Sequence, residues 1–155
     1  MQNIPSMDKP TRENRNGSIF YYSLHGLLPT GHLLASNVKI RSLSLVTDGP
    51  LIIEQQQLTD CELRVLLPIL KAFPTYCPYD VLLANISSAS VTQNTIKQWR
   101  QHLEMAQKDG TWPQELRPLR RALSSLRTKL HSFDLEISTV RERGCSLTGL
   151  LPVNP

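Results

Sequence analysis

The clearest alternation of apolar and polar positions in this chain lies between residues 116 and 130. Apolar residues recur there at alternating steps of three and four, the spacing that places side chains on one face of an α-helix. The pattern predicts a helix over about residues 117–130 with a single buried face. That face consists of Leu116, Leu119, Leu123, Leu126 and Leu130.

Two further helices are predicted upstream by helix-start signals that precede apolar residues at helical spacing. Thr59 and Glu62 form a T-x-x-E capping box, and the apolar residues after it predict a helix over about residues 60–73. Pro68 lies inside this helix and removes one backbone hydrogen-bond donor. Pro78 is expected at the first helical position of a second, shorter helix.

A third helix is predicted over about residues 91–108. Ser90 and Gln93 fit the capping-box pattern at its start, and Gly110 is a suitable residue to end it. The helix is expected to bury one face, on the core or on a second subunit. That face consists of Ile96, Trp99, Leu103 and Ala106.

Patterns typical of β-strands flank the helices on both sides. Apolar residues alternate roughly every second position from Val38 to Leu45 and resume after a turn at residues 48–50, which predicts a small antiparallel sheet. The apolar residues after the last helix predict a β-hairpin over about residues 137–147. The expected fold class is therefore α+β.

The length of 155 residues suits a single domain. Residues 1–17 are polar and have almost nothing to bury, so we expect a disordered tail. Residues 18–37 hold aromatic and leucine side chains interrupted by Gly and Pro, and we expect a strand or short helix packed on the main domain. The main domain is expected over residues 38–150, with a helical insertion at about residues 87–115.

The whole net charge of the chain lies in the last helix and the hairpin after it. The formal net charge is +4, and from Arg117 to Arg143 seven basic residues stand against three acidic ones, whereas the rest is balanced. A solvated helix face is the ordinary explanation for a run of charge. Arginine dominates here, however, and its planar fork suits phosphates and guanine edges, so we expect a nucleic-acid footprint.

The segment LRRALSSLRTKLHSFDLEISTVRERGCSL resembles the recognition helix and wing of the OmpR/PhoB type of winged-helix DNA-binding domain. That family is typically written V-x-x-x-I-x-x-L-R-x-K-L followed by I-x-T-V-R-G-x-G-Y. The upstream segments LTDCELRVLLPIL and CPYDVLLANI are similar to its first two helices, so the resemblance covers roughly residues 38–148. The matching residues are Leu119, Leu123, Leu126, Arg127 and Leu130 in the helix and Ile137, Thr139, Val140, Arg141 and Gly144 in the wing.

The chain departs from this family in four respects. Glu142 replaces a wing glycine, and Gly144-Cys145 stands where the family has Gly-Tyr. Pro68 interrupts the first helix, and the insertion replaces a short connection. We also expect no receiver domain, since the residues before the sheet are too few to fold as one.

The insertion allows a second alignment of the recognition helix. The spacing of the family's helix is also matched by Thr92, Ile96, Trp99, Arg100 and Leu103. We favour residues 117–130, because this segment adjoins the wing and carries the arginine cluster.

The resemblance implies a small transcriptional regulator that binds double-stranded DNA, with the helix of residues 117–130 in the major groove and the wing of about residues 137–147 beside it. The alternative is a winged-helix protein-interaction module that binds a regulator, a polymerase subunit or a second copy through the helix of residues 91–108 and the N-terminal aromatic segment. The candidate DNA-binding residues are Arg117, Arg120, Arg121, Ser124, Ser125, Arg127, Lys129, Thr139, Arg141 and Arg143.

No pattern in the chain favours an enzyme, a metal site or a cofactor. Four His and three Cys residues lack ligand spacing, and the common catalytic and nucleotide-binding motifs are missing. The uncharged stretch of residues 16–38 is interrupted by Gly and Pro, so we expect no membrane span. An odd number of cysteines without a C-x-x-C pair, together with a polar start, predicts a cytoplasmic protein.

Overall fold

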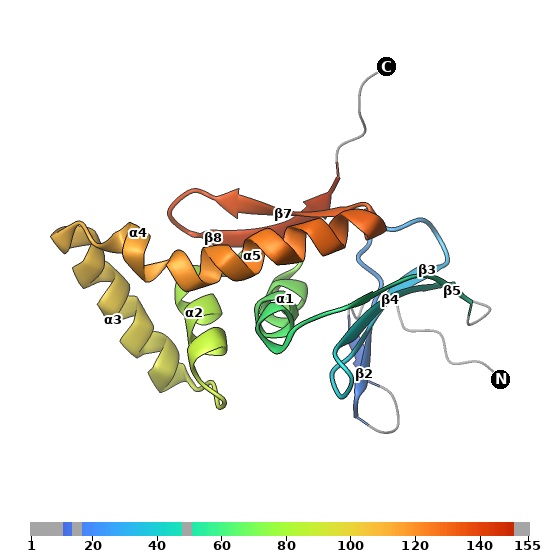
Figure 1. Ribbon diagram of the computed structural model, residues 1–155, viewed down its shortest axis with the longest axis horizontal. Coiled ribbons are helices and arrows are strands. Elements are labelled where there is room, and N and C mark those ends of the chain that lie inside the picture. Colours follow the sequence, from blue (N-terminus) through green and yellow to red (C-terminus); the bar gives the residue numbers. More distant parts are fainter. Residues whose placement is uncertain (1–10, 14–16, 48–50, 151–155) are drawn as a thin grey trace, which may run out of the picture.

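The structure is a computed structural model, and it describes residues 11–13, 17–47 and 51–150 (Figure 1). Over these residues the chain has an α+β fold, as the sequence pattern predicts. A five-stranded antiparallel sheet comes first along the chain, the helices follow, and the C-terminal hairpin completes a second sheet of three strands.

The N-terminal sheet is a meander in which each strand pairs with the next one in sequence. One face of the sheet is apolar, because Tyr22, Leu34 and Leu45 lie opposite one another and are at most 8% exposed. These side chains belong to the same hydrophobic core as the helices. The strands are β1 (Thr11–Glu13), β2 (Ile19–Tyr22), β3 (His32–Asn37), β4 (Ser42–Thr47) and β5 (Ile52–Gln57).

The sheet begins earlier in the chain than the sequence pattern predicts. β1 lies within the segment expected to be a disordered tail, of which residues 1–10 and 14–16 lie outside the described residues. The segment of residues 18–37 supplies two central strands, β2 and β3, so it is an integral part of the sheet.

The prediction of a strand that starts at Val38 is wrong. β3 ends at Asn37, whose side-chain oxygen accepts hydrogen bonds from the backbone N–H groups of Lys39 and Ile40 at 3.1 and 3.3 Å. These hydrogen bonds stabilise a turn that asparagine favours, because its side chain takes the place of a backbone acceptor. The apolar alternation therefore crosses a turn, and β4 begins only at Ser42.

Helix α1 (Asp60–Ala72) confirms the first predicted helix and its capping box. The hydroxyl of Thr59 accepts from the N–H of Glu62 at 3.1 Å, and the Glu62 carboxylate accepts from the N–H of Thr59 at 2.8 Å. The helix continues through the buried Pro68. The short strand β6 (Cys77–Pro78) then leads into α2 (Tyr79–Ser87). Pro78 was predicted at the first helical position, but it is the N-cap residue of α2.

Helix α3 (Gln93–Asp109) confirms the helix predicted in the insertion, but not its start signal. The capping box is formed by Thr92 and Thr95, each hydroxyl accepting from the other residue's N–H, so the prediction of Ser90 and Gln93 is wrong. Gly110 ends the helix in the left-handed conformation, as predicted. The short helix α4 (Trp112–Glu115), which the sequence pattern did not indicate, follows it.

Helix α5 (Arg117–Leu130) carries the leucine pattern and passes through a short 3-10 turn, η1 (His131–Phe133), into the hairpin. The hairpin strands are β7 (Leu135–Val140) and β8 (Gly144–Gly149), and β6 extends them to the strand order β6-β8-β7. Figure 1 shows α1 and α5 in the middle of the molecule, with the N-terminal sheet at one end and α3 at the other.

Gly144 is required where β8 meets β6. A Cβ atom at this position would collide with the backbone carbonyl of Cys77. This glycine matches a wing glycine of the family pattern, and the close approach of two backbones explains why a side chain does not fit there.

A buried ion pair joins the end of the N-terminal sheet to both central helices. The carboxylate of Glu62, at the start of α1, is 3% exposed and lies 2.7 Å from the ammonium of Lys129 near the end of α5. The same ammonium donates to the backbone carbonyl of Gln57 at 2.8 Å, at the end of β5. Burial acts to raise the pKa of Glu62, but the hydrogen bonds from Lys129 and Thr59 outweigh it and lower this pKa below its usual value.

We expect Lys129→Ala to lower the free energy of unfolding by about 2 to 3 kcal/mol, because it leaves a buried carboxylate without its cation. Urea denaturation at neutral pH measures this change. Arg121→Ala, which removes an exposed cation from the same helix, is the matched control and should change stability by less than about 0.5 kcal/mol. Equal effects of the two substitutions would show that the ion pair is not stabilising.

The lowered pKa of Glu62 also predicts a loss of stability in acid. A carboxylate whose pKa is lowered by folding stabilises the folded protein fully at pH values above its pKa in the unfolded chain, here 4.5. This contribution is lost as the pH falls through the lower pKa of the folded state. Glu62→Gln should therefore lose less stability than the unmodified protein between about pH 7 and about pH 3. Urea midpoints at the two pH values test this, and identical losses would contradict it.

Candidate nucleic-acid interface

Helix α5 separates apolar from cationic side chains along its length. The five leucines of the predicted face are at most 4% exposed, and the helix packs against α1 and β7. The opposite face is exposed, and its residues also recur at steps of three and four, so they form one stripe that we call the outer stripe. The outer stripe consists of Arg117, Arg120, Arg121, Ser124 and Thr128.

The three arginines of the outer stripe are exposed. Arg117, Arg120 and Arg121 form no ion pair with any residue in the described ranges, and the first turn of α5 contains no acidic residue. These arginines occupy the N-terminal half of the helix, where the helix dipole adds positive potential. This part of the surface is therefore electropositive and available to an anionic ligand.

The two predicted serines lie at different angles around α5. Ser124 is exposed in the middle of the outer stripe. Ser125 is also exposed, but its hydroxyl donates to the backbone carbonyl of Ala122 at 3.2 Å and lies on the side of the helix near Glu62. Ser124 is consequently the better placed of the two to contact a ligand on the outer stripe.

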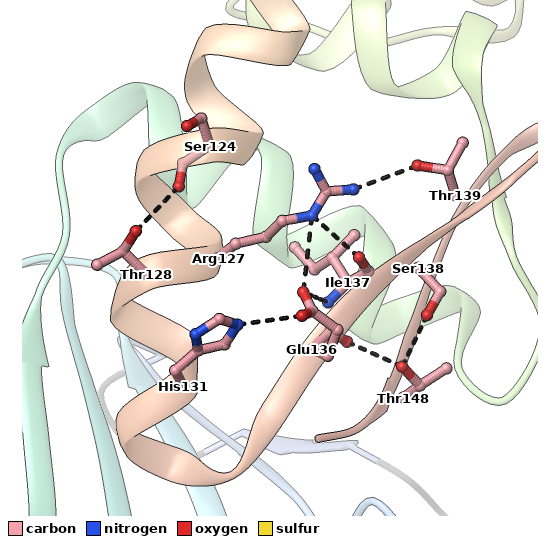
Figure 2. Close-up of polar contacts among 9 residues, drawn as sticks. All are labelled: Ser124, Arg127, Thr128, His131, Glu136, Ile137, Ser138, Thr139 and Thr148. Atoms are coloured by element: carbon pink, nitrogen blue, oxygen red, sulfur yellow. Dashed lines mark hydrogen bonds and ion pairs between the residues drawn. The ribbon is translucent and has the colours of Figure 1, made fainter. Parts of the chain in front are cut away.

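Arg127, another predicted DNA contact, connects α5 to the hairpin (Figure 2). Its Nε donates to the backbone carbonyl of Ile137 at 3.0 Å, and one of its terminal nitrogens donates to the hydroxyl of Thr139 at 3.2 Å. The Glu136 carboxylate lies 3.6 Å from the same Nε and also receives a contact from His131 at 3.1 Å. The guanidinium is thus engaged by β7 and fixes the hairpin against the helix.

Lys129 is likewise engaged within the protein, through Glu62 and Gln57. Two of the seven predicted cations, Lys129 and Arg127, therefore have intramolecular partners, and Thr139 is a partner of one of them. The sequence could not distinguish them from the free arginines, because all lie off the leucine face. What separates them is the presence of an acceptor on a neighbouring segment.

The remaining predicted cations lie in the turn of the hairpin. Arg141 and Arg143 are exposed, and they form no ion pair with a described residue. Glu142 lies between them in a left-handed backbone conformation, with φ of 61°, and is exposed as well. The turn therefore carries two cations and one anion.

The hairpin turn and the first half of α5 converge at Tyr79, the first residue of α2. The backbone N–H of Tyr79 donates to the carbonyl of Arg143 at 3.1 Å. Burial raises the pKa of the Tyr79 hydroxyl, and the nearby charge of Arg120 opposes this shift. The backbone of the hairpin turn and the charge of Arg120 thus both lie near one buried tyrosine.

Helix α3, the alternative recognition helix, lies elsewhere. It packs on α2 and α4, whereas the hairpin packs on α5. Arg100 is paired at 2.9 Å with the buried Asp80 of α2, and the indole N–H of Trp99 donates to the Ser87 hydroxyl at 3.0 Å. Leu103 is buried, but Ile96 and Trp99 are only partly buried, so the predicted face is covered at its C-terminal half. Of the two candidate helices, α5 is therefore the one that lies beside the hairpin.

The contact of Asp80 with Arg100 was not indicated by the sequence. Asp80 is 8% exposed and also accepts from the N–H of Val81 at 2.8 Å. Its position in the first turn of α2 was visible in the sequence, but a partner 20 residues away on another helix was not. The pair attaches the insertion to α2 and leaves the outer stripe of α5 uncovered by it.

Comparisons with known proteins add no relative to this picture. No protein-family model matches the chain, and searches of curated proteins and of solved structures give no significant match. Among the described residues, no helix is long and apolar enough to cross a membrane. The same part of the chain has no group of three or more His, Cys, Asp or Glu side chains arranged to hold a metal ion.

We expect Arg127→Ala to loosen the hairpin, because it removes two hydrogen bonds from β7 and leaves the Ile137 carbonyl unsatisfied. The free energy of unfolding should fall by about 1 to 2 kcal/mol, and the backbone amides of β7 should exchange hydrogen faster. Mass spectrometry measures the rate of hydrogen exchange in both β7 and the N-terminal sheet. The rate in the N-terminal sheet should not change. If β7 exchanges at the original rate, Arg127 does not hold the hairpin.

Proposed function

We propose that the protein binds double-stranded DNA through the outer stripe of α5 and the turn of the hairpin, as a winged-helix transcriptional regulator. The observation that carries this proposal is the row of three unpaired arginines on the exposed face of α5. A cationic helix face without intramolecular partners is suited to a polyanion, since each guanidinium can pair with a phosphate or read a guanine edge.

The arrangement of the elements supports the same proposal. α1, α2 and α5 are followed by a hairpin, which is the order implied by the resemblance to the OmpR/PhoB domains. The insertion of α3 and α4 precedes α5 without covering its exposed face. A helix with a free face fits the major groove of B-DNA, which is about 12 Å wide.

The contacts within the protein divide the predicted residues into two roles. Ligand contact is assigned to Arg117, Arg120, Arg121 and Ser124 on α5, and to Arg141 and Arg143 in the hairpin turn. Positioning is assigned to Arg127, Thr139 and Lys129, which hold the helix and hairpin in place. As a DNA-binding regulator, the protein would act in the compartment that contains the DNA.

The binding constant should depend strongly on salt. If the five free arginines each neutralise one phosphate, log K should fall with log salt at a slope of about −4 to −5, from roughly −0.9 per contact. Reversal of two charges in the variant Arg120→Glu/Arg121→Glu should abolish binding and leave the fold intact, because both residues are exposed and off the leucine face. Fluorescence anisotropy with labelled duplexes and genomic fragments measures binding, and circular dichroism checks the fold.

A matched control places the same change of charge on α3. Lys97 and Lys108 are exposed there, so Lys97→Glu/Lys108→Glu should bind DNA nearly as well as the unmodified protein. Loss of binding in this variant alone would move the interface to α3. Binding that is absent at low salt, or unaffected by the reversal on α5, would refute DNA binding by α5 and favour the protein-interaction module instead.

A further inference from the structure

Two buried cysteines from distant parts of the chain face each other across the C-terminal sheet. Cys77 of β6 and Cys145 of β8 are direct partners in the antiparallel register, and they are 2% and 0% exposed. Cys61, the third cysteine, is exposed on α1 and lies outside this sheet. The pairing could not be predicted from the sequence, because nothing in the spacing of the cysteines indicates that these two strands are neighbours.

The hydrogen bonds between β6 and β8 define which type of antiparallel residue pair Cys77 and Cys145 form. The N–H of Tyr79 donates to the carbonyl of Arg143, and antiparallel strands repeat the same type of pair every second residue. Cys77 and Cys145 are therefore a hydrogen-bonded pair, for which the Cα atoms are about 5.5 Å apart. This separation falls in the range of about 4.4 to 6.8 Å that a disulfide bond spans.

The side chains also point the same way. Directly opposed residues of an antiparallel pair lie on the same face, with Cβ atoms about 4.5 to 5.5 Å apart. A disulfide requires about 3.5 to 4.5 Å, and hydrogen-bonded pairs lie at the wider end of the cross-strand range, so the two Cβ atoms need to approach by about 1 to 2 Å. β6 is a strand of two residues at the edge of its sheet, so it is the strand that would move.

We propose that Cys77 and Cys145 form an intramolecular disulfide when the protein meets an excess of a small-molecule disulfide such as oxidised glutathione. Because both thiols are buried, the reaction requires the edge strand β6 to separate transiently from β8. One exposed cysteine then loses its proton to solvent and attacks a sulfur of the oxidised glutathione, which releases one reduced glutathione and leaves a mixed disulfide on the protein. The second cysteine then displaces the bound glutathione. Two protein thiols are oxidised, and one glutathione disulfide is reduced to two thiols.

The chemical environment makes this oxidation slow at neutral pH. Burial raises the pKa of Cys77 to about 12 and that of Cys145 to about 11, so little thiolate is present. Because the thiolate is the attacking species, the rate should rise with pH. We therefore expect the pair to be oxidised slowly.

The bond would connect the segment before α2 to the second strand of the hairpin. It closes a loop of about 70 residues that contains α2 to α5, and a cross-link over such a loop stabilises mainly by constraining the unfolded chain. We expect the melting temperature to rise by about 5 to 10 °C. This inference does not depend on DNA binding, and its test uses neither DNA nor the arginines of α5.

The experiment uses Cys61→Ser, so that the exposed thiol cannot interfere. The folded protein is incubated with excess oxidised glutathione at about pH 8.5, and samples are quenched in acid. Mass spectrometry should show a loss of about 2 Da, and peptide mapping should identify the link between Cys77 and Cys145. The control Cys61→Ser/Cys145→Ala retains one of the two thiols, so it should gain glutathione or stay unmodified and should not show the rise in melting temperature.

Three results would overturn the proposal. The first is a folded protein that keeps both thiols or stops at the mixed disulfide, while the same chain forms the link when unfolded in urea. The second is a link that forms but lowers the melting temperature, because the native backbone would then not accommodate it. The third is a rate that does not increase with pH. Circular dichroism of both variants before oxidation confirms that the comparison is made on folded protein.

Discussion

Burial of the leucine face of α5 is the constraint on which the rest of the molecule depends. Five leucines on one side of a helix must be removed from water, and α1 and β7 supply the surfaces that cover them. The outer stripe lies on the opposite side of the helix from the leucines, so burying the leucines leaves the outer stripe exposed to solvent. The cationic surface of the protein is thus a direct consequence of how its core is packed.

Polar contacts then fix α5 in position at two points. Lys129 joins the helix to Glu62 and to the end of the N-terminal sheet, and Arg127 joins it to the hairpin. Both cations lie on the side of the helix, between the buried face and the outer stripe. They add to the hydrophobic core that the hairpin, the sheet and the helices share.

The insertion is attached to this unit from outside. Asp80 holds Arg100, Trp99 bonds to Ser87, and the rings of Tyr79 and Trp112 meet edge to face at 5.9 Å. These contacts bind α3 and α4 to α2 and to one another, so the additional helices extend the molecule at one end. Long insertions in a surface connection are tolerated because the entropy of closing a loop grows only slowly with its length. α3 and α4 therefore lie beyond α2 and leave the outer stripe of α5 exposed.

The sequence by itself determined the class of fold, the helices α1, α3 and α5, the hairpin and the concentration of charge, because each depends on local periodicity or on composition. It did not predict β1, which lies in a polar segment. It also did not predict the turn at Asn37, because the apolar alternation continues through the residues that this side chain binds. Only the tertiary structure decided which cations are engaged, because Lys129 and Arg127 are partly buried beside acceptors on α1 and β7, whereas Arg120 and Arg121 are exposed. The register that opposes Cys77 to Cys145 was decided in the same way. Contacts between distant segments depend on how the elements pack, and no local pattern records that packing.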